Sequence, residues 1–363
     1  MSTTDKRGPL QVARRARLLE ALQRDGVLRI SDLTDALGAA AVTIRRDIAQ
    51  MASEGLVRRV HGGVALPTAE EAADEVGGGS LGMLVPSLDY YWPNVAQGAE
   101  EAARELDMRI VLRGTSYDTE DDRPQLSRLV DLGVEALIVA PRMDAPTASR
   151  TIEWLETTGL PVVLLERTAT AGPHHAVLES VVTDHALGAA MAVRHLVALG
   201  HRKVGVVLAE HSPTTPHVRR GWLEASAECG LNIEATVDEL VPDARSPACA
   251  PALDRALNRA FHTGTTALLV HADAEAIALV QRCEERGLEV PGDLSLVAYD
   301  DEVAGLFSPA LTAVRPPRRS IGRAAVRLVA DRLADPDRPT HRVVISPALR
   351  VRDSTTAPAV HHG

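Results

Sequence analysis

The chain has 363 residues, of which 45% are hydrophobic, which is enough to pack two or three domains. Its three cysteines form no CxxC pair, which excludes a disulfide framework and a standard zinc site. No apolar run reaches the roughly 18 residues that a membrane span requires.

The net charge of −10 argues at first against a nucleic-acid partner, but the charges are unevenly distributed. Residues 1–66 hold 11 Lys and Arg against 7 Asp and Glu, which leaves 28 against 42 for the other residues. A basic N-terminal part on an acidic body is typical of a DNA-binding module fused to a sensor. The polar start has no secretory signal pattern, so we expect a cytoplasmic protein with no membrane partner.

Residues 39–64 contain a predicted helix that could enter a DNA major groove. Ile44, Ile48 and Met51 follow the i, i+4, i+7 spacing of one buried helical face. A helix that buries one face and offers Thr and Arg from its first turns suits the base edges of the groove. Thr43, Arg45, Arg46 and Gln50 lie largely off the buried face, and the candidate DNA-contacting residues among them are Thr43, Arg45 and Arg46.

A short hairpin is expected to follow this helix. Residues 56–60 read as a strand, residues 61–63 as a turn, and residues 64–66 as a returning strand. Together with a predicted helix upstream, this outlines a winged helix-turn-helix domain over residues 1–66. The candidate DNA-contacting residues on the wing are Arg58, Arg59 and His61.

The runs TIRRD at 43–47, EGL at 54–56 and RRVHGG at 58–63 closely resemble the DeoR-type winged helix-turn-helix. The resemblance covers residues 14–66 and implies that the TIRRD run lies on the recognition helix. An ordinary basic surface helix is the alternative. In the DeoR type a Val-Ser pair usually precedes the recognition helix, whereas this chain has AAAV at 39–42. The missing hydroxyl is expected to remove one phosphate or base contact.

Residues 67–80 are acidic and then Gly-rich, without apolar periodicity, and are predicted to be a linker. After it, short Val/Ile/Leu-rich strands alternate with amphipathic helices in two blocks of similar size. This pattern predicts an α/β sensor of two doubly wound parallel-sheet subdomains, in addition to the small N-terminal domain. Ligands of such folds bind at the carboxyl ends of the strands.

A second resemblance covers residues 81–352. The runs LGHRKVG at 199–205, VPGDLSLVAYDD at 290–301 and PALTAV at 309–314 look like signatures of the LacI/GalR sensor domain, which resembles periplasmic sugar-binding proteins. This implies a homodimer on a pseudopalindromic double-stranded DNA operator, repressing carbohydrate uptake or catabolism genes. It also implies a small effector, a sugar or related polyol or nucleoside, bound between the subdomains.

The same resemblance places three chain crossings near Thr183, Val314 and Arg342. The expected first subdomain is 81–183 with 315–342, the second is 184–314 with 343–352, and residues 353–363 form a tail. Members of this family normally have a hinge helix before the sensor, and the predicted linker shows no such pattern.

The candidate effector-binding residues stand at the predicted strand ends or where the family has ligand contacts. Three adjacent aromatics at 90–92 are notable in a chain with 2% aromatics, and they could stack on a ring or pack under their loop. Asp273 could accept hydrogen bonds from the effector or cap the following helix. The full candidate set is Tyr91, Trp92, Arg142, Glu166, Arg220, Asp273 and Asp300.

Two other classes of protein compete with a regulator. A sugar-binding transport component is disfavoured by the DNA-binding module and by the lack of a signal pattern. An enzyme acting on a sugar or nucleoside would be revealed by turnover assays. No nucleotide-binding, zinc-protease or nucleophile-elbow motif is present, so no catalytic residue, cofactor or metal is expected. The histidines at 174–175, 211 and 217 match no standard metal spacing.

Overall fold

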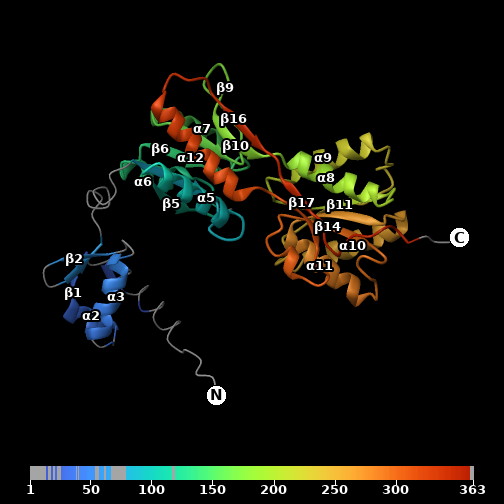
Figure 1. Ribbon diagram of the computed structural model, residues 1–363, viewed down its shortest axis with the longest axis horizontal. Helices are drawn as coiled ribbons and strands as arrows, with labels where there is room; N and C mark the ends of the chain where they lie inside the picture. The colour runs from blue at the N-terminus through green and yellow to red at the C-terminus, as the bar shows by residue number, and fades with distance from the viewer. Residues whose placement is uncertain are drawn as a thin grey trace. The chain divides into compact units, whose positions relative to one another are not determined.

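The computed structural model of the protein describes residues 14, 18, 21–22, 26–37, 39, 41–53, 57–60, 63–66, 79–116 and 119–359. The chain divides into two compact units, residues 1–78 and 79–363 (Figure 1). No helix among the described residues is long and apolar enough to cross a membrane.

The first unit is a winged helix-turn-helix domain, as predicted. Helices α2 (Ile30–Leu37) and α3 (Ala41–Ser53) accompany an antiparallel sheet in the order β1-β3-β2. The strands are β1 (Val27–Arg29), β2 (Arg58–Val60) and β3 (Gly63–Ala65). The core is formed by Leu18, Leu22, Leu33, Ile44, Ile48, Met51, Val57 and Val64.

Strand β1 was not predicted, because three residues are too short to show an alternating pattern. It pairs with β3 in the register Val27↔Ala65 to Arg29↔Gly63. A Cβ atom on Gly63 would lie 2.5 Å from the Leu28 carbonyl oxygen, so only glycine permits this close approach. The sheet therefore joins the wing to the segment that precedes α2.

The second unit contains two six-stranded sheets, each covered by helices on both faces. The first sheet has the order β16-β10-β7-β6-β4-β5, and all its neighbouring strands are parallel. Its strands are β4 (Ser80–Val85), β5 (Arg109–Gly114), β6 (Ala136–Val139), β7 (Val162–Leu165), β10 (Glu179–Thr183) and β16 (Arg342–Ile345). A two-stranded hairpin, β8 (Thr170–Ala171) and β9 (Ala176–Val177), lies apart from this sheet.

Helices α5 (Trp92–Glu105) and α12 (Arg318–Ala334) share one core with the first sheet. Helices α6 (Arg123–Asp131) and α7 (Ala148–Thr157) belong to a separate core with the same strands. The two cores show that the two helix pairs cover opposite faces, as the near-continuous apolar strands predicted.

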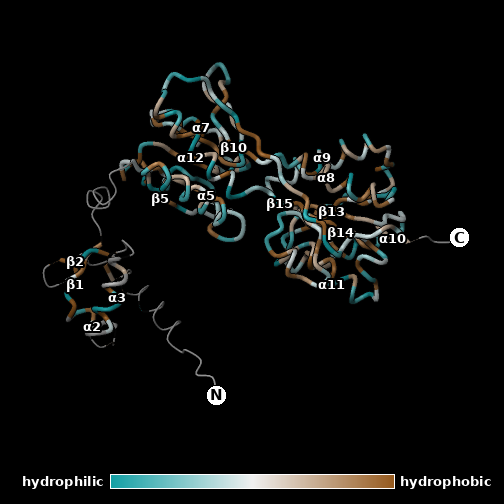
Figure 2. The backbone as a smooth tube through the Cα atoms, in the orientation of Figure 1, coloured by the Kyte–Doolittle hydropathy of each residue, from teal (hydrophilic) through white to brown (hydrophobic). Residues whose placement is uncertain are grey.

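The second sheet has the order β12-β11-β13-β14-β15-β17, parallel except for the last pair. Its strands are β11 (Val204–Ala209), β12 (Asp238–Val241), β13 (Ala267–His271), β14 (Ser295–Tyr299), β15 (Thr312–Arg315) and β17 (Ala348–Arg350). The helices are α8 (His185–Ala198), α9 (Thr215–Glu228), α10 (Cys249–Thr263), α11 (Asp273–Glu285) and the 3₁₀ turn η1 (Ala304–Leu306). Hydrophobic residues concentrate along the strands (Figure 2).

Glycines set the position of α12 against α5. A Cβ atom on Gly98 would lie 2.1 Å from the Arg319 carbonyl oxygen, and one on Gly322 would lie 2.0 Å from the Val95 carbonyl oxygen. Since no side chain fits there, the two helix backbones are in direct contact. This contact holds the first residue of α12, Arg318, at a defined point beside the crossing that precedes it.

The chain passes between the two sheets after Thr183, after Arg315 and after Ile345. The third crossing corrects the prediction, which placed it near Arg342 and assigned residues 343–345 to the second subdomain. These residues form β16, which pairs with β10 in the register Val181↔Val343. An edge strand of four half-exposed or exposed residues has too weak a pattern to be assigned to a sheet from sequence.

The predicted tail is also corrected at its start. Ser354 is fully buried in the second subdomain; its Oγ donates to the Leu296 carbonyl and accepts from the Thr312 backbone N–H. Asp353 donates its backbone N–H to the Ala310 carbonyl. The segment is held by hydrogen bonds to strands, and not by an apolar face, so periodicity could not reveal it.

Candidate functional site

Helix α3 presents the two predicted arginines on its outer side. Ile44, Ile48 and Met51 are buried in the domain core, whereas Arg45 and Arg46 are exposed. Thr43 is half-buried. The arrangement fits the predicted recognition helix, because the buried stripe fixes the helix while two guanidinium groups near its N-terminal half lie outside the core.

Asp47, in the same TIRRD run, has a different role. It is buried, and the Arg14 Nε atom lies 2.6 Å from its Oδ2 atom. The ion pair ties α3 to the segment that contains Arg14. The position of Asp47, three residues after Ile44 on the helix, already placed it near the buried face.

Of the three predicted wing residues, the structure describes the side chain of Arg58 only. Arg58 is half-buried, and its Nε donates to the Leu66 carbonyl oxygen at 3.3 Å, across the hairpin. Arg59 lies in β2, but its side chain is outside the described part of the chain. His61 lies outside the described residues. Arg58 thus helps to brace the wing besides any contact with phosphate.

In the second unit, the predicted residue Glu166 follows β7, and its side chain is buried between residues on both sides of the first crossing. Its carboxylate accepts hydrogen bonds from the Thr183 backbone N–H at 2.8 Å, from the Thr183 hydroxyl at 2.7 Å and from the Tyr91 hydroxyl. The His185 Nε2 atom lies 3.5 Å from its Oε2 atom. Glu166 has a positive φ of 52°, which aims its side chain at this crossing.

These contacts determine the charge of Glu166. Burial alone would raise the pKa of the carboxyl group, but the interaction with His185 and the hydrogen bonds from Thr183 and Tyr91 outweigh it and lower the pKa to about 2. Glu166 is therefore ionised at neutral pH, and its oxygen atoms are already occupied by protein donors. This leaves it poorly placed to receive hydroxyl groups of an effector.

Asp300, which follows β14, differs from Glu166. It is 9% exposed, has a positive φ of 97°, and among the described residues its carboxylate makes no hydrogen bond or ion pair. Burial raises the pKa of Asp300 to about 7, the Arg318 guanidinium opposes this shift, and the Asp273 carboxylate adds to it. An acceptor group left without a donor in this position is suited to receive donors from a ligand.

Arg318 is the main residue that sequence reasoning missed. It begins α12 and is 7% exposed. Its guanidinium lies 5.1 Å from the centroid of the Tyr91 ring, and its Nη2 donates to the Asp300 carbonyl oxygen. The Nε atom is 2.9 Å from a Glu302 oxygen, close enough for an ion pair although the geometry is not that of a hydrogen bond. No local pattern signals this residue, because its partners are distant in sequence.

The contacts of Asp273 differ from both predicted roles, which were effector binding and capping of the following helix. It is fully buried, and its two carboxylate oxygens accept the backbone N–H groups of all four residues at 301–304, at 2.7 to 3.1 Å. It caps the loop after β14 and not its own helix, and its oxygens are unavailable to an effector. Asp273 thereby shapes the backbone that presents Asp300.

Trp92 is likewise a core residue, since it is 2% exposed and belongs to the core that α5 shares with α12 and the first sheet. The alternative that an aromatic packs under the loop therefore holds for Trp92. Its neighbour Tyr90 is 44% exposed, yet burial around its hydroxyl and the Asp300 carboxylate raise the pKa of that phenol. Tyr90, which was not among the candidates, is thus the exposed aromatic beside Asp300.

Arg142 and Arg220 each contact residues near them in the sequence or in a neighbouring loop. The Arg142 guanidinium lies 3.0 Å from the Asp144 carboxylate and donates to the Thr119 carbonyl at 3.1 Å, which organises the loop after β6. Arg220 is exposed on α9, where its Nε is 3.9 Å from Glu224.

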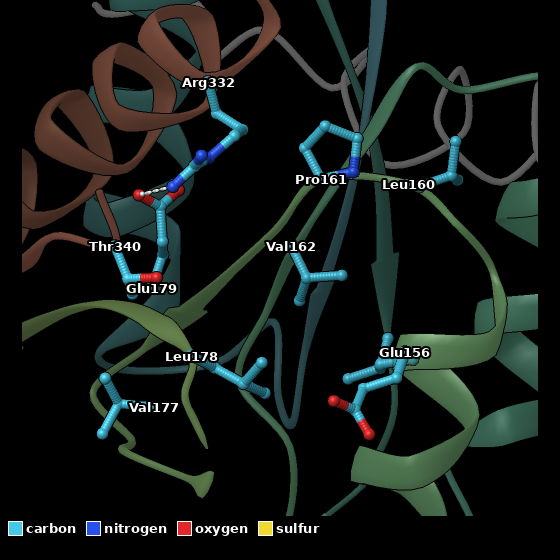
Figure 3. A pocket seen from close by; sticks show the side chains of 10 residues that line it. Glu156, Leu160, Pro161, Val162, Val177, Leu178, Glu179, Arg332 and Thr340 are labelled. Atoms are coloured by element: carbon cyan, nitrogen blue, oxygen red, sulfur yellow. Dashed lines mark hydrogen bonds and ion pairs between the residues drawn. The ribbon is translucent and has the colours of Figure 1, made fainter. Parts of the chain in front are cut away.

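Two cavities open elsewhere on the first subdomain. One, of about 200 Å³, lies at the amino ends of β7 and β10, where Glu179 is ion-paired with Arg332 at 3.1 Å (Figure 3). The other, of about 590 Å³, is lined by residues of the β8–β9 hairpin and α7. Glu166 and Thr183 stand at the opposite, carboxyl ends of the same strands. Within the described residues, no group of His, Cys, Asp or Glu could hold a metal ion.

The raised pKa of Asp300 predicts a pH effect on stability. Between its ordinary pKa of 3.8 and about 7, the folded protein keeps a proton that the unfolded chain releases. Lowering the pH from 8 to 6 should therefore raise the free energy of unfolding, by at most about 1.4 kcal/mol per pH unit for one proton.

The Asp300→Asn variant provides the reference in urea unfolding at pH 6, 7 and 8. Glu166 stays ionised throughout this range, so the difference between the two proteins reports on Asp300 together with its electrostatic interaction with His185. Parallel stability curves over this range would show that Asp300 does not titrate there.

Comparison with known proteins agrees with this architecture. A DeoR-like helix-turn-helix domain matches residues 14–70, and a periplasmic binding protein-like domain matches residues 193–355. The chain is 26% identical over 279 residues to the HTH-type transcriptional repressor PurR of Aliivibrio fischeri strain MJ11, covering 76% of this chain and 80% of that protein.

A second relative is the arabinose metabolism transcriptional repressor of Geobacillus stearothermophilus, 24% identical over 328 residues and covering 86% of each chain. A LacI family transcriptional regulator from Enterococcus faecium, solved with bound ribose, has a TM-score of 0.62 and 22% identity. It covers 77% of this chain and 100% of that chain, and at this identity it supports the fold. Both relatives are named as repressors, and neither as an enzyme.

A winged helix-turn-helix with exposed arginines, followed by a two-subdomain sensor, defines a DNA-binding transcriptional regulator that carries its own sensor. The two domain matches and the relatives support a LacI/GalR-type regulator with a DeoR-like helix-turn-helix domain. The predicted resemblance to this family and the predicted fold class are confirmed.

Proposed function

We propose that this protein is a transcriptional repressor whose affinity for its operator is set by a small, uncharged, sugar-like effector. The observation that carries the effector part is the Asp300 carboxylate, nine-tenths buried at the end of β14, without a hydrogen-bond donor among the described residues and beside the exposed Tyr90. A carboxylate accepts two hydrogen bonds from adjacent hydroxyl groups, and an aromatic ring can cover the apolar face of a sugar.

The names of similar proteins support this class of effector. One relative is named for arabinose metabolism, and one structural neighbour was solved with ribose. The DNA part rests on Arg45 and Arg46, which α3 holds outside the core, with Arg58, Arg59 and His61 as wing contacts. We infer a homodimer on a pseudopalindromic operator. Two DNA-binding domains related by a two-fold axis match two half-sites that lie about one helical turn or a multiple apart.

A thermal-shift screen of sugars, polyols and nucleosides would test the effector part most directly. A ligand at 100 times its dissociation constant stabilises the folded protein by about 2.7 kcal/mol through mass action. Asp300→Asn should abolish that shift and the effector response in a mobility-shift assay, while operator binding stays nearly intact. The proposal fails for Asp300 if the variant responds to the ligand as strongly as the parent protein.

An enzyme acting on the same sugars remains the rival function. We propose that the chain catalyses no reaction and acts in the cytoplasm, where its operator DNA would be accessible. Incubating the purified protein with each ligand that gives a thermal shift, and analysing the mixture for products, separates the two functions. Stoichiometric binding without turnover is the expected result.

A further inference from the structure

Tyr91 connects two side chains that belong to different chain crossings. The Tyr91 hydroxyl donates to Glu166, whose carboxylate accepts hydrogen bonds at the first crossing. The Tyr91 ring lies under the guanidinium of Arg318, which follows the second crossing. Its ring is also 5.3 Å from that of Trp92, in an edge-to-face arrangement, so the Tyr91 ring is anchored on the core of the first subdomain. Burial, followed by the Glu166 carboxylate, raises the pKa of Tyr91 well above its ordinary value, so the phenol stays a donor.

From Glu166 the contacts continue into the second subdomain. The His185 Nε2 atom is 3.5 Å from the Glu166 carboxylate, and its Nδ1 atom is 3.0 Å from the Tyr299 hydroxyl. The same Tyr299 hydroxyl also lies 3.3 Å from the His185 carbonyl oxygen. His185 is the first residue after the crossing at 184, and Tyr299 is the last residue of β14. Through Glu166, His185 and Tyr299, these contacts connect the first crossing to the end of β14.

From Arg318 the contacts reach the same strand end. Arg318 donates to the Asp300 carbonyl and lies 2.9 Å from the Glu302 carboxylate. Asp300 directly follows Tyr299, so the path starts and ends at adjacent residues. It forms a closed ring of contacts that passes through both subdomains and beside two of the three crossings.

We propose that this ring, which we call the inter-subdomain tie, fixes the angle between the two sensor subdomains and transmits the effector response. The residues of the tie are Tyr91, Glu166, His185, Tyr299 and Arg318. The transmission of the effector response rests on the proposed function, which places the effector at the Asp300 carboxylate. The backbone carbonyl of the same residue accepts the hydrogen bond from Arg318. A ligand that moves the backbone at Asp300 also moves Arg318, because the Asp300 carbonyl accepts its hydrogen bond. The contact of Arg318 with the Tyr91 ring then changes, and so does the position of the second crossing.

The tie can change state because each subdomain is a packed unit and only a few polar contacts join them along this path. Hinge motions are absorbed by a few residues at crossings of this kind. A ligand can shift the angle only by its different affinity for the two arrangements, and the tie supplies that difference at Arg318.

The experiment measures the angle directly in the full-length protein, with neither DNA nor effector present. Spin labels are attached at Glu153→Cys on α7 and Arg255→Cys on α10, both exposed, after Cys229→Ser removes the half-buried cysteine. Double electron–electron resonance then gives the distance distribution between the subdomains. Tyr91→Phe removes the donor to Glu166 and keeps the ring under Arg318, so it disturbs the fold least.

Arg318→Gln removes the other half of the path, and Arg319→Gln is its matched control. Arg319 is the next residue of α12, but its contacts, Gln97 at 2.8 Å and Glu101 at 3.5 Å, lie on α5 of the same subdomain. We expect Tyr91→Phe and Arg318→Gln to broaden or shift the distribution, and Arg319→Gln to leave it as in the parent. The double variant should change it no more than the single ones, because both break one ring.

An unchanged distribution in folded Tyr91→Phe and Arg318→Gln proteins would overturn the tie, and circular dichroism with urea unfolding establishes that they are folded. An equal change of the distance distribution in Arg319→Gln would overturn it as well, since the loss of any positive charge at the start of α12 would then have the same effect as the loss of Arg318. If the variants shift the distribution but no sugar, polyol or nucleoside does so in the parent, the tie stands and the effector part of the proposed function fails.

Discussion

Replacing Arg45 or Arg46 with alanine is expected to weaken operator binding by about 1–3 kcal/mol, because an arginine that reads a base edge contributes that much to discrimination. Both side chains are exposed on α3, whereas Ile44 and Ile48 hold the helix in the core, so the domain should remain folded. The measurement is a mobility-shift titration on an operator selected from genomic fragments, carried out at two salt concentrations.

Arg58→Ala on the wing is the companion variant. A phosphate contact contributes to the salt dependence more than to sequence preference, so this change should reduce the slope of affinity against salt by about one unit. Since Arg58 also donates to the Leu66 carbonyl, thermal unfolding of the variant checks that the wing is intact. Unchanged affinity in both recognition-helix variants would rule out the proposed docking of α3.

Replacing Trp92 with alanine is expected to destabilise the sensor by about 3–5 kcal/mol, as removal of a fully buried Trp does. Trp92 lies in the core that α5, α12 and the first sheet share, so the cavity would open under the contact that positions Arg318. Urea unfolding followed by circular dichroism gives the value.

Tyr90→Ala is the matched comparison, two residues before Trp92 in the loop that leads into α5. Tyr90 is largely outside the core, so its loss should cost at most about 1 kcal/mol of stability. It should instead weaken binding of any ligand found in the thermal-shift screen. Similar destabilisation by both changes would mean that Tyr90 is a packing residue and that no aromatic of this loop faces an effector.

Position along a strand indicated which candidate residues lie near one another. Tyr91, Glu166 and Asp300 each follow a strand of a parallel sheet, and contacts through Arg318 connect them, while their role in effector binding stays a prediction. Position alone could not assign their roles. Glu166 is occupied by Thr183 and His185, whereas Asp300 has no donor among the described residues.

The corrected residues share a cause. Trp92 and Asp273 stand at strand or loop ends like the others, yet one enters the core and the other caps residues 301–304. Which way a side chain points from such an end depends on the loop conformation, and the sequence pattern carries little information about it. The same holds for Tyr90, where a positive φ of 61° turns the aromatic ring toward the exposed side.

The sequence by itself determined the family resemblance, the order of the two units and the alternation of strands and helices, because these depend on local periodicity and on contiguous motifs such as TIRRD at 43–47 and YDD at 299–301. The tertiary structure alone decided that β16 returns to the first sheet, that Ser354 is buried in the second subdomain, and that Arg318 meets Tyr91. Arg318 and Tyr91 are separated by more than 200 residues, so no window along the chain contains both. Such contacts are set by the packing of whole helices, here by the direct backbone contact of α5 and α12 at Gly98 and Gly322.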